Sequence, residues 1–321
     1  MKDHVIGIDL GGTKIATGIL DREGNVLHRQ VTRCHAGENP DVVIDAVVDN
    51  VNLLLSHSNF SLEEIRGIGV GSTGHIHSEK GIVLTSSNLP GWDNHPLKNV
   101  LEQRLGAKVI LDNDANCAAW AEFKYGAGRG SHHMCYITFS TGCGMGIIID
   151  GKLYRGATGT AGEIGHVLVN PDGPLCTCGK KGCLMSYACG LALSRMAEEY
   201  LESGKPTLLR DLVISDDCRI AGEDIAKAAQ LGDQPAIEMI MTAGRYFGYG
   251  LSTIIQVLNP DCIIIGGGLV NLGPILLDPC MEAMNQNIHP VLVGSTKIAL
   301  SELWNDAGMI GAGALVWEQM G

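Results

Sequence analysis

Three cysteines lie within eight residues of the sequence, in the stretch CTCGKKGC (176–183), and a histidine precedes the first of them by ten residues. Thiolates and imidazoles are good zinc ligands, and four of them close a tetrahedral site. A disulfide would leave one of these cysteines without a partner, and the Cys-x-x-Cys spacing of redox pairs is missing. The spacing therefore favours a zinc site, with unliganded surface thiols as the main alternative. Its ligands would be His166, Cys176, Cys178 and Cys183.

Two carboxylates, Asp112 and Asp114, form a second candidate group, in the stretch LDNDAN (111–116) between a predicted strand and a predicted helix. On the local pattern, Asp114 is interpreted as a helix cap. The chemical interpretation is a carboxylate that takes a proton from an attacking hydroxyl during phosphoryl transfer, where positioning and charge neutralisation supply most of the catalysis. The pattern leaves both interpretations open.

Three glycine-rich turns are able to hold phosphates: DLGGTK (9–14), STGCGMG (140–146) and GGG (266–268). Glycine lets backbone N–H groups approach and cradle an anion. The spacing Gly-x-Gly-x-x-Gly is absent from all three, which argues against a dinucleotide fold. Each turn taken alone is better explained as a tight turn of the chain than as a phosphate site. The first two turns belong to a weak internal repeat, in which Asp9 matches Ser140 and Asp21 matches Asp150.

Predicted strands and helices alternate along the chain, which is typical of an α/β protein. Strands are predicted by short apolar runs and helices by apolar residues at helical spacing. The predicted strands are three within 4–31, then 67–71, 108–114, three within 135–156, 262–269 and 297–301, and the predicted helices are 39–56, 115–126, 233–260, 273–286 and 306–320.

Size and charge limit the classes of function. The 321 residues suggest about two domains, and a net charge of −12 argues against a nucleic-acid-binding face. No stretch reaches the ~18 apolar residues of a membrane span, and Asp9 interrupts any signal-peptide core. Eleven cysteines, an odd number, indicate a reducing compartment. We therefore expect a cytoplasmic protein with neither nucleic acid nor membrane as a partner.

The stretches IGIDLGGTK, STGCGMGIIIDG, GEIGH and CTCGKKGC occur in this order, and with them the chain resembles the ROK family (repressors, open reading frames and kinases) from Ile6 to about Gly313. The resemblance implies an α/β actin-like ATPase (ribonuclease H-like) fold with two lobes around a cleft. The small lobe would be 1–118 plus 305–321, and the large lobe, with the zinc knuckle, 119–304. The resemblance also implies transfer of the γ-phosphoryl group of Mg·ATP to the C6 hydroxyl of a hexose.

The same resemblance implies a role for each motif residue. Asp114 would be the catalytic base, Asp9 would help to hold hydrated Mg²⁺, and a structural zinc would fix His166. The residues implied for ATP are Asp9, Gly11, Gly12, Thr13, Lys14, Thr141, Gly142, Gly266, Gly267 and Gly268. Those implied for the sugar are Asn88, Asn113, Asp114, Glu163 and His166, and those for zinc are His166, Cys176, Cys178 and Cys183.

One residue departs from the family pattern. The family has a sugar-binding glutamate two residues after the last knuckle cysteine, and here that position is Met185, whose thioether is a weak acceptor. The identity of the hexose, and whether a donor other than ATP is used, therefore stay open. The stretch NLPGW (88–92) resembles glucokinases, and STG (72–74) resembles N-acetylmannosamine kinases.

We expect a glucokinase, with an N-acetylmannosamine kinase as the nearest alternative and a sugar-binding regulator without turnover as another. The family's repressors carry an added N-terminal helix-turn-helix, whereas here the first predicted strand begins near His4. The resemblance further implies a homo-oligomer, either a dimer or a tetramer.

Overall fold

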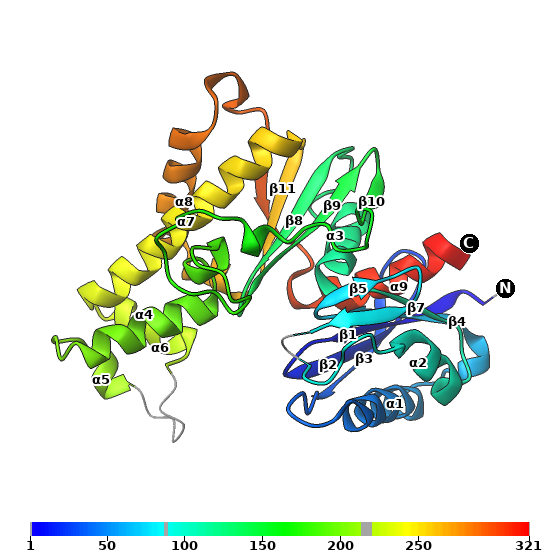
Figure 1. The fold of residues 1–321 in the computed structure, drawn as a ribbon. Coiled ribbons are helices and arrows are strands. Elements are labelled where there is room, and N and C mark those ends of the chain that lie inside the picture. Colours follow the sequence, from blue (N-terminus) through cyan, green and yellow to red (C-terminus); the bar gives the residue numbers. More distant parts are fainter. Residues whose placement is uncertain (1, 87–88, 213–219, 321) are drawn as a thin grey trace. The chain divides into compact units, whose positions relative to one another are not determined.

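The computed structural model describes residues 2–86, 89–212 and 220–320 (Figure 1). It divides into two compact units. Unit 1 comprises Met1–Tyr136, Met145–Gly162 and Ser301–Gly321, and unit 2 comprises Ile137–Gly144 and Glu163–Leu300. The lobe boundaries expected from the sequence stay a prediction. No helix in the described ranges combines the length and the apolar character that a membrane span requires.

Strands and helices alternate as predicted, and every predicted strand and helix is found at or near its expected position. Unit 1 contains β1 (His4–Leu10), β2 (Lys14–Leu20), β3 (Val26–Arg33), α1 (Pro40–Ser56), β4 (Ile65–Ser72), β5 (His75–His77), β6 (Ile82–Thr85), α2 (Leu97–Leu105), β7 (Val109–Asn113), α3 (Asp114–Tyr125), β10 (Lys152–Tyr154) and α9 (Ala307–Met320). Unit 2 contains α4 (Gly190–Glu202), α5 (Leu209–Leu212), α6 (Gly222–Gln230), α7 (Gln234–Leu258), β11 (Cys262–Gly266), α8 (Pro274–Asn287) and β12 (Lys297–Leu300). Strands β8 (Met134–Phe139) and β9 (Cys143–Ile149) contribute residues to both.

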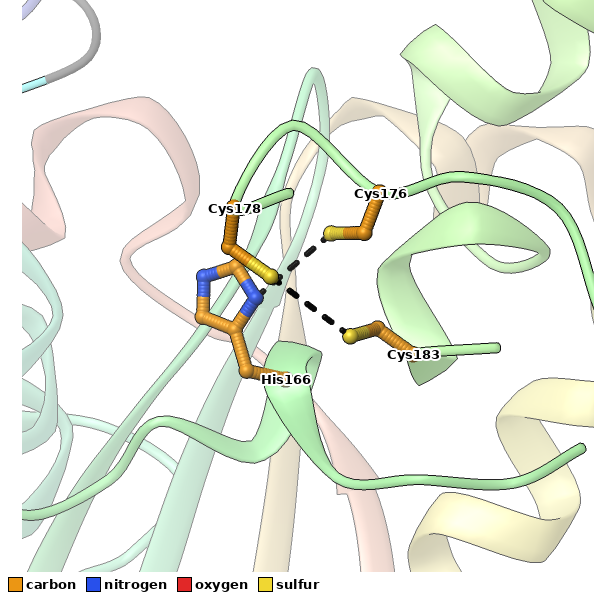
Figure 2. Close-up of side chains that lie close together, drawn as sticks. All are labelled: His166, Cys176, Cys178 and Cys183. Atoms are coloured by element: carbon orange, nitrogen blue, oxygen red, sulfur yellow. Dashed lines mark hydrogen bonds between the residues drawn. The ribbon is translucent and has the colours of Figure 1, made fainter. Parts of the chain in front are cut away.

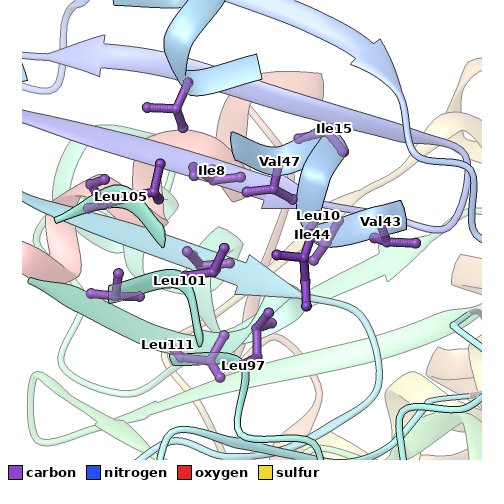
Figure 3. Packing of buried hydrophobic residues seen from close by; sticks show 14 of the residues in the cluster. Ile8, Leu10, Ile15, Val43, Ile44, Val47, Leu97, Leu101, Leu105 and Leu111 are labelled. Carbon is purple, nitrogen blue, oxygen red and sulfur yellow. The ribbon is translucent and has the colours of Figure 1, made fainter. Parts of the chain in front are cut away.

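The sheet of unit 1 has the strand order β3-β2-β1-β4-β7. Strands β1, β4 and β7 are parallel, and β2 is antiparallel to both of its neighbours, β1 and β3. Alternate residues of a strand point to opposite faces. On one face, Ile6, Ile8 and Leu10 of β1 pack with α1 and α2 in the main core (Figure 3). Helix α2 contributes leucines at every fourth position, so that its apolar face meets the sheet. These are Leu97, Leu101 and Leu105.

The opposite face of this sheet is covered by α9, which comes unusually close to the strands. A Cβ on Gly7 would lie 2.0 Å from the carbonyl oxygen of Met309, and one on Gly69 would lie 1.7 Å from that of Ala312. No Cβ tolerates such distances, so both strand positions require glycine. This close approach explains why the last helix is rich in small residues.

The helix ends follow the local sequence signals. The side chain of Asn39 accepts a hydrogen bond from the N–H of Val42 at 3.2 Å and caps α1, with Pro40 at the first helical position. Asp233 caps the long buried helix α7 in the same way, and Asn259 ends it in the left-handed conformation, with φ of 43°. The sequence therefore specifies these boundaries locally.

The second sheet has the order β10-β9-β8-β11-β12, with β11 and β12 parallel. Its β8–β9 turn and the β1–β2 turn each have three residues, 140–142 and 11–13. The strand ends therefore pair Gly11 with Ser140, which moves the first match of the predicted internal repeat by two positions and agrees with the second, Asp21 with Asp150. Asp9 is equivalent to Thr138 and not to Ser140, because strand boundaries rather than similar letters determine the alignment.

Candidate active site and zinc site

The carboxyl end of the unit 1 sheet gathers the predicted acidic residues. In the register of the three parallel strands, Asp9 pairs with Gly71 and Gly71 pairs with Asp112. Neighbouring strands lie about 4.8 Å apart, so the Cα atoms of Asp9 and Asp112 are about 10 Å apart. Asp114 follows β7 directly. Burial, together with the negative charges of Asp112, Asp114 and Asp9, raises the pKa of the Cys117 thiol, which places all three carboxylates around it.

Asp9 lies against the first turn of α9. A Cβ on Gly308 would be 3.0 Å from the Asp9 Cγ atom and 3.2 Å from Oδ2, so glycine at this position makes room for the carboxylate. Burial raises the pKa of Asp9 to about 6, while Lys14 opposes the rise and Asp306 adds to it. Sequence reasoning did not single out Gly308, because nothing local distinguishes it from the other small residues of this helix.

Asp114 is the first residue of α3, and the helix cap is Asn113 rather than Asp114, which corrects the local interpretation. The Asn113 side-chain oxygen accepts from the N–H groups of Ala115 at 2.9 Å and Asn116 at 3.2 Å. Its amide nitrogen donates to the carbonyl oxygen of Gly74 at 3.0 Å. The Asn113 oxygen is thus occupied by capping, which leaves one amide hydrogen for the predicted sugar contact. Asn88, the other predicted amide, lies outside the described residues.

The neighbouring carboxylate, Asp112, is buried and pairs with Arg155. The Arg155 Nε atom donates to Asp112 Oδ2 at 2.7 Å. Sequence analysis named Asp112 without giving it a role and missed Arg155, since the two residues are 43 positions apart and belong to no common motif.

Different hydrogen bonds hold the two hairpin tips that are predicted to bind phosphate. In unit 1 the tip 11–13 is closed by a hydrogen bond from Gly11 N–H to the Lys14 carbonyl at 3.1 Å. In unit 2, the N–H groups of Gly190 and Leu191 at the start of α4 donate to the carbonyls of Ser140 and Thr141, at 2.7 and 3.2 Å. A helix start therefore holds the second tip in place.

A cavity of about 550 Å³ in unit 2 brings two of the predicted ATP-binding segments together. Thr141 and Gly268 both line it, although 127 positions separate them in the sequence. Gly267, just before, has φ of +92°, and a Cβ there would lie 2.4 Å from the carbonyl oxygen of Phe139. The polar lining residues that sequence analysis missed are Ser194, Glu223, Gln230 and Asn271.

The four predicted zinc ligands come together in unit 2 (Figure 2). Their ligand atoms all lie within 4.8 Å of one another. The sulfurs of Cys178 and Cys183 are 3.7 Å apart, and Cys176 Sγ is 3.6 Å from His166 Nδ1. A tetrahedral zinc with bonds of about 2.3 Å to sulfur and about 2.0 Å to nitrogen requires separations of about 3.8 and about 3.5 Å. The residues therefore fit a structural zinc site.

The knuckle sequence folds locally as a small antiparallel turn. The N–H of Cys176 donates to the Lys180 carbonyl at 2.7 Å, and the N–H of Gly179 donates to the Cys176 carbonyl at 2.9 Å. Gly179 and Gly182 have φ of 81° and 73°, which favour glycine. Although burial opposes ionisation, hydrogen bonds from Cys178 and then from His166 lower the pKa of Cys176 to about 6, which suits a metal ligand.

Two of the predicted sugar residues, Glu163 and His166, lie beside the knuckle. With Nδ1 of His166 turned to the sulfurs, its Nε2 atom lies 4.0 Å from a carboxylate oxygen of Glu163. Met185 is half-buried beside the same segment, since its Cβ atom lies 3.4 Å from an ideal Cβ on Gly165. Its Sδ atom is 3.7 Å from an ideal Cβ on Gly142, so the thioether lies between the knuckle and the second hairpin tip.

Comparison with known proteins defines the class. A crystal structure described as a ROK family glucokinase from Streptomyces griseus in complex with glucose and AMPPNP matches with a TM-score of 0.85 at 35% identity, over 98% of this chain and 99% of that one. The fold is therefore the predicted actin-like fold. The ROK family model matches residues 5–319, and the chain belongs to the ROK family.

Relatives within the family differ in their activities. A glucokinase of Streptomyces coelicolor is 36% identical over 98% of this chain and 97% of its own length. A xylose repressor of Caldicellulosiruptor bescii is 31% identical over 98% of this chain and 78% of its own length. Membership of the family alone therefore does not separate an enzyme from a regulator.

Proposed function

We propose that this protein is an ATP-dependent hexose kinase that transfers the γ-phosphoryl group of Mg·ATP to the C6 hydroxyl of glucose. The observation that carries the proposal is the register at the carboxyl end of the unit 1 sheet, which brings Asp9 and Asp114 to one edge. The full-length similarity to glucokinases supports the same conclusion.

In this proposal, unit 1 supplies the residues that act on the sugar hydroxyl, the magnesium and the phosphates. Asp114 accepts the proton of the C6 hydroxyl as the oxygen attacks phosphorus, and the capped turn before α3 holds it at the helix start. Magnesium, when bound with ATP, neutralises phosphate charge, and Asp9 helps to hold its water shell. Gly11 closes the tip through its own N–H, and the N–H groups of Gly12 and Thr13, together with the charge of Lys14, bind phosphate oxygens.

Unit 2 supplies nucleotide and sugar contacts. Thr141 and Gly142 contact phosphates, and Gly266–Gly268 border the adenosine in the cavity of about 550 Å³. Zinc is structural, because four protein ligands leave no open position for a water. With Nδ1 bound to such a zinc, the Nε2–H group of His166 would be held in a set direction, from which it and Glu163 would contact sugar hydroxyls.

ATP is proposed as the donor on the similarity to a glucokinase whose crystal structure holds AMPPNP. None of the ten cysteines in the described ranges forms a disulfide, which supports action in the reducing cytoplasm. We also infer a homo-oligomer, a dimer or tetramer, on the family resemblance alone.

The site restricts the identity of the sugar less than that of the nucleotide, because Met185 lies beside the Glu163–His166 segment. A thioether replaces a charged acceptor there, so discrimination between hexoses that differ near C1 and C2 should be reduced. Glucose is proposed on the similarity to glucokinases, and N-acetylmannosamine is the nearest alternative.

Release of ADP with a panel of sugars tests the proposal. Glucose, mannose, fructose, allose and N-acetylmannosamine are each supplied with Mg·ATP, and a reaction without sugar is the control. Glucose is expected to give the highest kcat/KM, with a KM of about 1 mM or below. A higher kcat/KM for N-acetylmannosamine would make that sugar, and not glucose, the proposed substrate. Sugar binding without ADP release would favour a regulator.

A further inference from the structure

A partly buried ion pair joins Asp112 on β7 to Arg155, which follows β10. Arg155 presents Nε and Nη2 to the same oxygen, Asp112 Oδ2, at 2.7 and 2.6 Å. The other oxygen, Oδ1, accepts the backbone N–H of Asn113 at 2.8 Å and the side-chain amide of Asn116 at 2.9 Å. The Asp112 side chain is 2% exposed and that of Arg155 is 25% exposed. Both oxygens of this carboxylate are thus fully engaged.

Stability alone is a weak explanation for this pair. Removing two charges from water costs about as much as their attraction returns, and apolar residues of similar volume often serve equally well. The partners of Asp112 indicate a geometric role instead. Through Asn113 and Asn116 it holds the strand-to-helix turn at which Asp114 begins α3.

Arg155 also begins the last segment of unit 1 before the chain enters unit 2 at Glu163. Its carbonyl accepts the N–H of Ala161 at 3.0 Å and closes the segment into a loop. Two glycines allow this loop to pack closely against the rest of unit 1. A Cβ on Gly159 would lie 2.7 Å from the carbonyl oxygen of Ile76, and one on Gly162 would lie 2.0 Å from that of Met145.

We propose that the Asp112–Arg155 pair is a positioning device that ties the start of α3 to the segment leading into Glu163 and His166. The proposal rests on the kinase function proposed above. Arg155 acts through Asp112 and is therefore a positioning residue, not a catalytic one. Lysine would keep the charge but lose the two-donor fork, so the two cations are not equivalent here.

Kinetics of paired variants give the first test. Arg155→Gln should lower kcat by about 10- to 100-fold and raise the KM for glucose, because a shift of about 1 Å at a reacting group has that effect. The KM for ATP should stay within about twofold of the wild-type value. Arg155→Lys should recover part of the loss. The double variant Asp112→Asn/Arg155→Gln should be no worse than the poorer single variant, because the two residues act as one unit.

Arg129→Gln is the matched control, since Arg129 pairs with Glu302 at 3.5 Å on the surface of the same unit. Its kinetics should equal those of the wild type. A purely structural role of Arg155 would lower the melting temperature but leave the kcat and both KM values of the folded fraction unchanged. That result would overturn the proposal, and Arg155→Lys provides the comparison if Arg155→Gln does not fold.

Hydrogen–deuterium exchange gives a readout that does not depend on activity. The proposal expects faster exchange in peptides covering 113–116 and 156–162 in Arg155→Gln than in Arg129→Gln, with the remaining core unchanged. Unchanged exchange in both peptides would contradict the positioning role. If the wild type phosphorylates no sugar, the proposed function fails, and the exchange result still decides whether the pair ties these segments together.

Discussion

Replacing Gly308 by alanine should reduce catalysis without unfolding the protein. The added methyl would lie 3.0 Å from Asp9 Cγ and 3.3 Å from its Oδ1 atom. Carbon atoms in contact prefer about 3.5–4.0 Å, so the carboxylate would have to move by about 0.5–1 Å. Asp9 is the residue proposed to hold the hydrated magnesium, and its displacement should therefore affect the metal-dependent step.

The size of the effect follows from that displacement. A misplacement of about 1 Å costs about 100-fold in rate, so a shift of 0.5–1 Å should lower kcat by about 10- to 100-fold. Overpacking costs about 1–3 kcal/mol, while alanine gains about 1 kcal/mol over glycine in a helix. The net loss of about 0–2 kcal/mol leaves a domain of ordinary stability folded.

The assay is steady-state ADP release with magnesium varied at fixed ATP and glucose. Gly308→Ala should show a lower kcat and a higher magnesium requirement, with the glucose KM unchanged. Gly37→Ala is the control, because a Cβ on this exposed glycine meets no atom within 4 Å. A folded Gly308→Ala protein with the kcat and magnesium dependence of the wild type would refute the placement of Asp9 at the metal.

Three further predictions concern the same groups. Because burial raises the pKa of Asp9 to about 6, the wild-type protein loses stability as the pH rises from about 4 to about 6, where Asp9 ionises in the unfolded chain first. Asp9→Asn should therefore raise the free energy of unfolding by about 3 kcal/mol at pH 8 and by less than about 1 kcal/mol at pH 4 in denaturant titrations, with activity lost. Asp114→Asn should keep its fold and glucose binding but lose about 10²–10⁴ in kcat, and a variant with most of its turnover would exclude Asp114 as the base. Protein purified without added zinc should contain about one equivalent by metal analysis, and Cys178→Ser should lower the metal content and weaken glucose binding more than ATP binding. Full activity at a metal content far below one equivalent would show that the protein does not require zinc.

Features set by neighbouring residues could be predicted from the sequence. The cap at Asn39, the left-handed end of α7 at Asn259 and the knuckle cysteines all depend on contacts within a few positions. Three of the predicted zinc ligands lie within eight residues, and only His166, ten residues before Cys176, is more distant in the sequence. Their observed separations match a tetrahedral site because the ligands belong to adjoining turns.

Features that depend on the fold could not be predicted in the same way. Gly308 meets Asp9 only because α9 returns to the first strand, and Arg155 meets Asp112 only because the fold brings the residue after β10 to the end of β7. The cap before Asp114 was assigned to the wrong residue, since Asp and Asn are both good caps and only the backbone decides between them. Tertiary contacts of this kind leave no periodic pattern in the sequence.

Transfer of labelled phosphate tests the central claim most directly. The wild-type protein and Asp114→Asn are each incubated with γ-labelled ATP, magnesium and glucose, and the sugar product is separated. The account predicts glucose labelled at C6 with the wild type and a rate lower by about 10²–10⁴ with the variant. Label that appears only as free phosphate with the wild type, or equal sugar labelling by both proteins, would contradict it.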